Sequence, residues 1–156
     1  MNRAPPAPLR FESTLAAPVE AVWAAARTAA GINFELGPWI RMALPTEGDI
    51  FDLPVGDFAG ACWLLFLGVL PFDRHRLRLM ACIDGPAPGF DEDSTSWLQR
   101  RWMHRRRIEP RGAGCVVIDE VIAVPRIGLF RGVVTRIAAA TFCHRHARLR
   151  RRFGAA

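Results

Sequence analysis

Two strand-like segments in the second half of the chain carry residues that could perform acid–base chemistry. The first, 99–109, contains His104, and the second, 115–124, contains Glu120. A carboxylate beside a histidine holds the imidazole in one tautomer and tunes its pKa, as a general acid or base requires. We therefore take His104 and Glu120 as the candidate catalytic pair.

Whether these two side chains meet depends on the turn that joins their strands, expected over 110–114. Residues that face each other across antiparallel strands lie on the same side of a sheet. If the turn holds an odd number of residues, His104 faces Glu120, and Trp102 faces Ile122 on the same inner face. An even-numbered turn breaks this pairing, so the chemistry is conditional on the turn.

The pair could equally have a structural or a ligand-binding role. A buried carboxylate needs a partner whether or not it has a function, so His104 and Glu120 could simply satisfy each other, or Arg106 could neutralise Glu120. The cluster could also bind the polar end of a ligand. Glu92, on the preceding strand, would approach Trp102 on this face if the intervening turn has an odd number of residues. With an even number, its neighbours in the sequence would do so instead.

The patterns of apolar residues predict the elements that must position these side chains. Helices are expected over 18–30, 32–36 and 127–152. Strands are expected over 9–15, 39–44, 61–67, 75–83, 90–94, 99–109 and 115–124, with a loop over 45–57 and a turn over 68–73. One strand, two helices, a run of antiparallel strands and a long helix indicate an α+β fold.

The long C-terminal helix carries an apolar stripe that should lie on the sheet. The stripe consists of Ile127, Phe130, Val134, Ile137, Ala138 and Thr141. Beyond Phe142 it is interrupted by arginines. We therefore expect the first four turns to lie on the sheet and the last turns to be more exposed to solvent. A helix that covers a curved sheet in this way encloses a hollow suited to a small apolar molecule.

The residues expected to bind such a molecule come from the strands and from the helix stripe. They are Trp63, Leu65, Leu79, Glu92, Trp102, Ile122, Phe130, Val134 and Ile137. Both faces of the strand 61–67 are apolar, so one face should line the cavity. The other face needs cover from the loop 45–57 or from a second subunit, and a homodimer is therefore a further hypothesis.

The length of 156 residues predicts a single domain over 1–156, in which the Pro- and Ala-rich segment 1–8 is expected to be flexible. This segment is not an apolar leader, and the best membrane candidate, 58–72, is too short to span. We therefore expect a cytoplasmic protein with no membrane span. The four cysteines have no CxxC spacing, so free thiols are expected rather than disulfides or a zinc site.

The positive side chains are all arginines, clustered over 100–107 and 145–152, and the net charge is +6. The basic strand lacks the aromatic ladder that single-stranded nucleic acid needs, so no nucleic-acid partner is expected. His144 and His146 splay around the last helix and do not converge on one metal ion. The chain has no phosphate loop, nucleophile elbow or HExxH motif, and we expect no metal and no cofactor.

Residues at the start of the chain, in the hairpin and in the last helix follow a known pattern. They are Phe11, Ser13, Ala17, Pro18, Val22, Trp23, Trp102, His104, Asp119, Val121, Pro125, Phe142, Arg145, His146, Leu149 and Phe153. Their order and spacing resemble the START-like, polyketide-cyclase-type superfamily called SRPBCC, most closely its small bacterial ligand-binding members. The resemblance implies a helix-grip α+β fold: a seven-stranded antiparallel sheet wrapped around a long C-terminal helix, with two short helices after the first strand.

The resemblance does not fix an activity, because the superfamily includes lipid carriers, hormone receptors, cyclases and coenzyme-binding proteins. The leading hypothesis is binding of a hydrophobic or aromatic small molecule, such as a lipid, in a cavity between the sheet and the long helix. The second is a polyketide cyclase/aromatase-like or dehydratase-like enzyme that uses His104 and Glu120 as acid and base. The third is binding of a polyanion or a membrane surface through the Arg-rich C-terminus.

Overall fold

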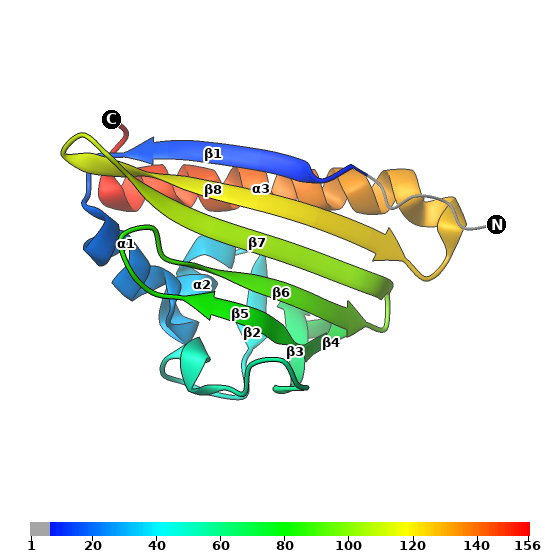
Figure 1. The fold of residues 1–156 in the computed structure, drawn as a ribbon. Coiled ribbons are helices and arrows are strands. Elements are labelled where there is room, and N and C mark those ends of the chain that lie inside the picture. Colours follow the sequence, from blue (N-terminus) through cyan, green and yellow to red (C-terminus); the bar gives the residue numbers. More distant parts are fainter. Residues whose placement is uncertain (1–6) are drawn as a thin grey trace.

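One long helix lies against a curled antiparallel sheet, and two short helices follow the first strand (Figure 1). The computed structural model describes residues 7–156. The helices are α1 (Val19–Ala26), α2 (Ala29–Leu36) and α3 (Arg131–Phe153), with 3₁₀ turns at Ile50–Asp52 and Gly128–Phe130. The strands are β1 (Leu9–Leu15), β2 (Ile40–Ala43), β3 (Gly60–Phe66), β4 (Leu70–Leu77), β5 (Leu79–Ile83), β6 (Gly89–Ser96), β7 (Gln99–Arg111) and β8 (Gly114–Pro125). This is the helix-grip α+β fold that the sequence predicts.

The sheet has eight strands because the single strand expected over 75–83 is divided in two. The strand order is β1-β8-β7-β6-β4-β3-β2, and β5 pairs with β6. The division falls at Arg78, whose backbone N–H donates to the Ser94 hydroxyl at 3.0 Å. The turn expected over 68–73 is shorter than predicted, since Leu67 and Gly68 adopt positive φ angles and β4 already begins at Leu70.

The turn between β7 and β8 holds two residues, because Arg111 pairs with Gly114. Gly112 takes a φ of +60°, which glycine adopts without strain. The even-numbered turn pairs His104 with Val121 rather than with Glu120. The inner face therefore carries the odd-numbered residues of β8: Cys115, Val117, Asp119, Val121 and Ala123, all of them buried. The predicted facing of His104 and Glu120 is wrong for this reason.

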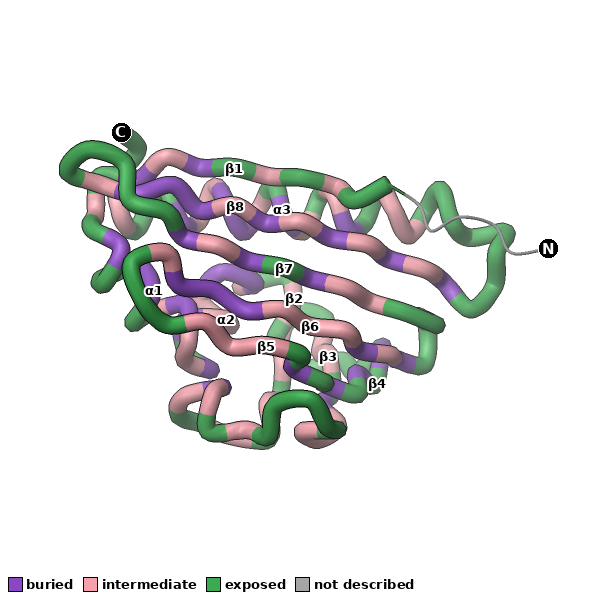
Figure 2. Tube along the Cα trace, viewed as in Figure 1, coloured by how far each residue is buried: buried purple, intermediate pink, exposed green. Residues whose placement is uncertain are grey.

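The buried half of α3 is its C-terminal half, the reverse of the prediction (Figure 2). The buried side chains of the helix are Ala138, Phe142, Arg145, His146 and Leu149. In contrast, the Ile137 side chain is 59% exposed, and Phe130 before the helix is 49% exposed. Hydropathy favoured the first turns as the buried ones. The turns from Ala138 to Leu149 are buried instead, because Arg145 and His146 find partners inside the protein. Only the final turn, with the exposed Arg150, Arg151 and Arg152, is open to solvent as predicted.

The apolar core lies between α1 and the part of the sheet next to the β7–β8 turn. Val19, Val22 and Trp23 form the buried apolar stripe of α1 and pack near Ile108 of β7 and Leu149 of α3. Each fully buried aliphatic side chain contributes about 1.5–3 kcal/mol to stability. This core fixes α1 against the sheet.

Asn33 fixes α2 beside the edge strand β2. Its side chain accepts a hydrogen bond from the Met42 backbone N–H at 2.7 Å and donates to the Met42 carbonyl at 3.0 Å. At the start of the helix, Thr28 caps α2 by accepting from the Gly31 N–H. The Asn33 contacts hold α2 at the rim of the sheet, next to α3. None of the helices in residues 7–156 has the length and apolarity needed to cross a membrane.

Candidate functional site

An apolar cavity lies between the sheet, α2 and the C-terminal half of α3. Its volume is about 180 Å³. The apolar wall is formed by Ile32, Leu36, Ile40, Met42, Leu44, Ile50, Leu64, Phe72, Leu77, Leu79, Phe90, Leu98, Trp102 and Phe142. The polar groups on the wall are Asp73, His75, Glu92, Gln99, His104, Thr141 and Arg145. A mostly apolar hollow with a few polar groups is typical of a small-molecule site.

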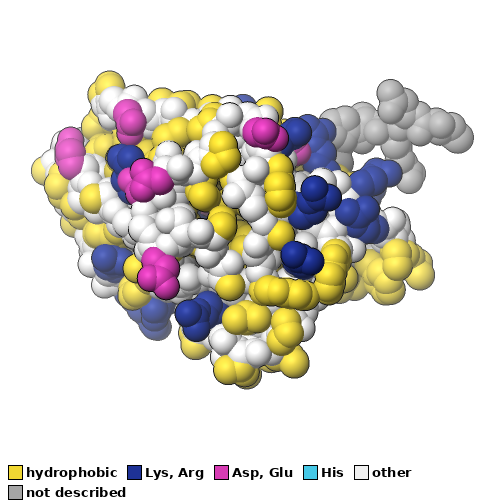
Figure 3. All heavy atoms as spheres, turned by 90° about the horizontal axis from the view of Figure 1, so that it is seen from below, with side chains coloured by type: hydrophobic (Ala, Val, Ile, Leu, Met, Phe, Trp, Pro, Cys, Tyr) yellow, Lys and Arg dark blue, Asp and Glu magenta, His cyan; other side chains and the backbone are white. Residues whose placement is uncertain are grey.

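A surface groove of about 600 Å³ adjoins the cavity. Leu36, Ile40, Phe72 and Thr141 line both spaces. The groove continues to the surface along Trp39, Phe66, Leu70, Ala140 and His144. Hydrophobic side chains are exposed over much of the face in Figure 3, with arginines among them. The groove therefore offers an apolar path between solvent and the cavity.

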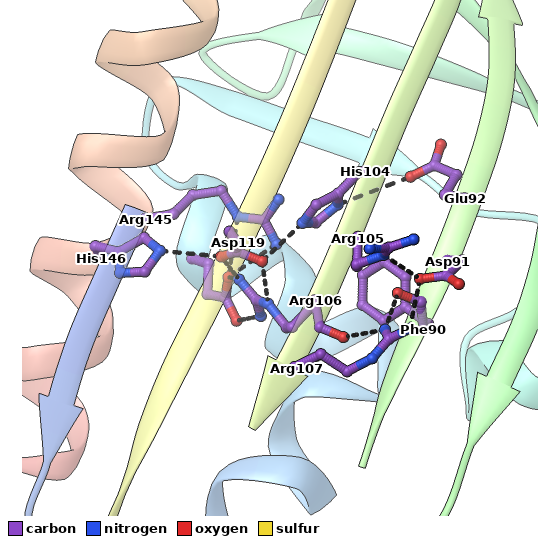
Figure 4. Close-up of polar contacts among 11 residues, drawn as sticks. Phe90, Asp91, Glu92, His104, Arg105, Arg106, Arg107, Asp119, Arg145 and His146 are labelled. Atoms are coloured by element: carbon purple, nitrogen blue, oxygen red, sulfur yellow. Dashed lines mark hydrogen bonds and ion pairs between the residues drawn. The ribbon is translucent and has the colours of Figure 1, made fainter. Parts of the chain in front are cut away.

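The first polar cluster on the cavity wall joins β4, β6 and β7. Glu92 Oε1 lies 2.7 Å from His75 Nε2 and accepts the Ser94 hydroxyl at 2.6 Å. Glu92 Oε2 lies 3.9 Å from His104 Nδ1 (Figure 4). Glu92 and His104 are direct partners in the register of β6 and β7, which places them on the same inner face. Thus the sheet itself brings the carboxylate and the imidazole together.

The second polar cluster centres on Asp119 of β8, which is fully buried. Its carboxylate accepts from His104 Nε2 at 2.8 Å, from Arg106 Nη2 at 2.7 Å and from His146 Nε2 at 3.0 Å. The Ser13 hydroxyl lies 2.8 Å from the other ring nitrogen of His146. Asp119 therefore connects β1, β7, β8 and α3 through side chains alone.

The negative charge of Asp119 is balanced by Arg106, which also forms an ion pair with Glu35, and a second ion pair joins Glu35 to Arg145 (Figure 4). Arg106 donates to both oxygens of Glu35 at 2.7 and 2.8 Å, and Arg145 donates to Glu35 at 2.9 Å. Two buried carboxylates thus meet two buried guanidinium groups, and Glu35 anchors α2 to β7 and α3. A buried charge cluster of this kind needs every partner, since removing one leaves an uncompensated charge.

The buried carboxylates are held in their ionised forms. Burial opposes ionisation of Asp119, but the charge of Arg106 and the hydrogen bonds from Arg106 and His104 outweigh it and hold its pKa well below 3.8. Burial likewise opposes ionisation of Glu92, yet the hydrogen bond and charge of His75 hold its pKa below 4.5. For His104, burial lowers the pKa below 6.5 against the attraction of Asp119. The neutral His104 donates Nε2–H to Asp119, which leaves Nδ1 as an acceptor.

Four of the predicted site residues line the cavity: Leu79, Glu92, Trp102 and His104. The other predicted residues on the strands do not. Trp63 and Leu65 lie on the outer face of β3, because the alternate residues Cys62 and Leu64 face inward. These placements correct the prediction, which had no means of choosing between the two apolar faces of this strand.

Glu120 and Ile122 lie on the outer face of β8, as the two-residue turn requires. Glu120 pairs with Arg10 at 2.8 Å and lies 3.7 Å from Arg105. Phe130, Val134 and Ile137 are likewise absent from the cavity wall, because α3 lines the cavity only through Thr141, Phe142 and Arg145. The seven corrected placements follow from one wrong turn parity, one wrong strand face and one wrong helix half.

The sequence reasoning missed His75, Asp119, Arg106, Glu35 and Arg145 as members of the polar clusters. The even-numbered alternative for the hairpin would have placed Asp119 beside Arg106 and His104. Glu35 and Arg145 carry no comparable signal, because their contact joins two helices 110 residues apart. Among residues 7–156, no group of three or more His, Cys, Asp and Glu side chains has a geometry that could hold a metal ion.

Solved structures share this fold at low sequence identity. CV1439 from Chromobacterium violaceum matches with a TM-score of 0.71 and 13% identity, over 97% of this chain and 100% of that one. Ara h 8.0201 matches with a TM-score of 0.56 and 12% identity, over 91% and 96% of the two chains. DynU16, from the dynemicin biosynthetic locus, has a TM-score of 0.58 and 14% identity, over 92% of this chain and 47% of DynU16. At such identities the likeness concerns the fold.

The sequence also matches one family model over nearly its whole length. The match covers residues 13–153, from β1 to the last turn of α3. It therefore includes every residue of the cavity wall and of both polar clusters. No curated protein sequence matches the chain. The chain belongs to the family described as Domain of unknown function (DUF8410).

Proposed function

We propose that this protein binds a hydrophobic or aromatic small molecule in the cavity, with the adjoining groove as the entrance. The observation that carries the proposal is the continuity of an apolar, partly enclosed hollow of about 180 Å³ with an apolar surface groove. Protein interiors are normally packed without voids of this size. A hollow that stays open and reaches the surface is suited to a ligand that moves in and out.

The composition of the wall supports an apolar or aromatic ligand body. Phe142 is fully buried, and its ring stacks near Phe11 and lies edge-on to His104. Trp102 lies beside it, with ring centroids 6.2 Å apart. Aromatic walls bind flat apolar molecules through large contact areas. The resemblance to the SRPBCC superfamily, and the origin of DynU16 in a biosynthetic locus, agree with a small-molecule ligand.

The internal contacts of the C-terminal arginines favour a small molecule over a polyanion. Arg145 binds Glu35, and Arg150 donates to the Ser13 hydroxyl at 2.7 Å. Arg148 donates to the Phe34 carbonyl, and its guanidinium lies 4.1 Å from the centre of the Phe34 ring. Arginines that are held by the protein's own groups are less available to phosphates on a partner.

A binding assay with a matched pair of variants tests the proposal. N-phenyl-1-naphthylamine, whose fluorescence rises in apolar surroundings, serves as the probe. Leu64→Trp adds bulk inside the cavity, whereas Leu65→Trp adds the same bulk on the outer face of β3. We expect saturable binding to the wild-type protein and to Leu65→Trp, and a loss of at least about tenfold in Leu64→Trp. Equal affinities in the two variants would contradict the proposal.

Native mass spectrometry of freshly purified protein extends this test to the natural ligand. A bound mass that disappears on denaturation identifies a co-purified molecule, and Leu64→Trp should lack it. A homodimer through the outer face of β3 stays a separate prediction, motivated by the exposure of Trp63 on that face. Sedimentation at high protein concentration measures it, and a monomer there counts against the dimer.

A further inference from the structure

Two hydrogen-bond acceptors face each other across the polar end of the cavity. Glu92 Oε2 and His104 Nδ1 lie 3.9 Å apart, which is too far for a hydrogen bond between them. Both residues belong to the cavity wall. Neither atom forms a hydrogen bond with any other group in residues 7–156. The pair is therefore open to a group that enters the cavity.

The neighbouring contacts decide that both atoms are acceptors. His75 and Ser94 both bind the other oxygen of Glu92, so Oε2 keeps its lone pairs free. Asp119 accepts the proton on His104 Nε2, which leaves the lone pair of Nδ1 directed away from Asp119. Phe90 and Phe142 each lie edge-on to the His104 ring, with centroids 4.9 Å away, and restrict its rotation. The two acceptors are thus fixed before any ligand arrives.

The nearby charged donor on the cavity wall is already engaged. Arg145 binds Glu35 through Nε at 2.9 Å and Nη2 at 2.8 Å. Asp73 accepts two backbone N–H groups through Oδ1. Gln99 Oε1 is a further buried acceptor on the wall, without a hydrogen-bond partner in the described chain. The cavity wall therefore carries three free acceptors, Glu92 Oε2, His104 Nδ1 and Gln99 Oε1, whereas its charged donor, Arg145, is already bound to Glu35.

We propose that the cavity selects ligands whose apolar or aromatic body carries a hydrogen-bond donor head, an amine or a hydroxyl, which binds between Glu92 Oε2 and His104 Nδ1. The inference rests on the proposed function and names its ligand class. One nitrogen can lie within hydrogen-bonding distance of two atoms that are 3.9 Å apart, so a primary amine can donate to both. A hydroxyl can donate to one of them. A carboxylate head would meet the Glu92 carboxylate and remain unpaired.

A series of naphthalene derivatives tests the preference, because the apolar body stays the same while the head changes. The probes are naphthalene, 2-naphthol, 2-naphthylmethylamine and 2-naphthoate, measured by equilibrium dialysis at pH 7.5. We expect the amine and the alcohol to bind at least about tenfold more tightly than naphthalene, the ratio for one hydrogen bond to a charged group. We expect 2-naphthoate to bind more weakly than naphthalene.

A variant pair on β6 assigns the preference to Glu92. Glu92→Gln replaces the free acceptor by an amide, so the ratio of amine affinity to naphthalene affinity should fall about tenfold. Asp93→Asn, on the outer face of the same strand, removes one negative charge at a site paired with Arg101 and should keep the wild-type ratio. The ranking of the four probes on wild-type protein provides a test that needs no variant.

The outcomes separate this inference from the proposed function. If all four probes bind with similar affinity, or if 2-naphthoate binds most tightly, the donor-head preference is overturned and apolar binding stands. An unchanged amine-to-naphthalene ratio in Glu92→Gln also overturns it. If naphthalene and its derivatives all fail to bind, the proposed function is contradicted, and the preference falls with it.

Discussion

His104 Nε2 and Asp119 Oδ1 lie 2.8 Å apart across the β7–β8 hairpin, and both side chains are buried. This contact joins the two polar clusters. On one side, His104 faces Glu92 and the cavity. On the other side, Asp119 binds Arg106 and His146, which belong to the network that attaches α3 to the sheet. The orientation of the imidazole at the cavity therefore depends on the same carboxylate that holds the fold together.

The central arginine of the buried network should contribute strongly to stability. Arg106→Met removes the shared partner of Glu35 and Asp119, and we expect the free energy of unfolding to fall by about 3–5 kcal/mol. Arg105→Met is the matched control on the outer face, where the exposed ion pairs of Arg105 are worth no more than about 1 kcal/mol. Urea denaturation of both variants measures the difference. Similar losses in the two would contradict the assigned role of the network.

Stability should decrease as the pH falls below about 6.5. Burial holds the pKa of His104 below its ordinary 6.5, so the unfolded chain takes up a proton there that the folded chain does not. The pKa values of Glu35 and Glu92 are held below 4.5 and that of Asp119 below 3.8, so these groups act in the same direction at lower pH. Their stabilisation is complete above pH 6.5 and lost stepwise in acid.

Chemical denaturation at pH 7.5, 5.5, 4.5 and 3.5 measures this dependence. One proton of difference between the folded and unfolded states changes the free energy of unfolding by about 1.4 kcal/mol per pH unit. We expect a slope of this sign to appear below pH 6.5 and to steepen below pH 4.5. A free energy of unfolding that stays constant or rises over the same range would show that the buried groups are not ionised as described.

The two halves of α3 should respond differently to truncation. Leu149 is 2% exposed in the core, so Leu149→Ala should cost about 2–5 kcal/mol. Ile137 is 59% exposed, and Ile137→Ala should stay within about 0.5 kcal/mol of the wild type. Thermal and urea denaturation of the two variants distinguish the observed helix orientation from the one that hydropathy favours. A larger loss in Ile137→Ala would support the orientation predicted from the sequence.

The fold could be predicted where the apolar pattern alone decides the structure. β1 lies at the predicted residues Leu9–Leu15, and α1 (Val19–Ala26) lies within the helix predicted over 18–30. In these elements each apolar side chain has one suitable environment. The order of elements indicates an α+β fold with an antiparallel sheet, and the resemblance to the SRPBCC superfamily implies its helix-grip arrangement.

The site was less predictable, because it depends on two facts that the apolar pattern does not contain. The hairpin parity rests on a single turn, in which the positive φ of Gly112 allows two residues rather than three or five. The burial of Arg145 depends on Glu35, which lies on a different helix. A polar residue is expected to be exposed when its partner lies far away in the sequence and cannot be foreseen. The sequence therefore favours Glu120 over Asp119 as the carboxylate beside His104.

The most direct test of the central claim is to locate a bound ligand by nuclear Overhauser effects between 2-naphthylmethylamine and the methyl groups of the protein. Leu36 and Leu79 line the cavity, whereas Leu65 and Ile137 point away from it. We predict saturable contacts from the naphthalene protons to Leu36 and Leu79, and none to Leu65 or Ile137. Contacts confined to Leu65 and Ile137 would place the ligand on the outer surface and contradict the account.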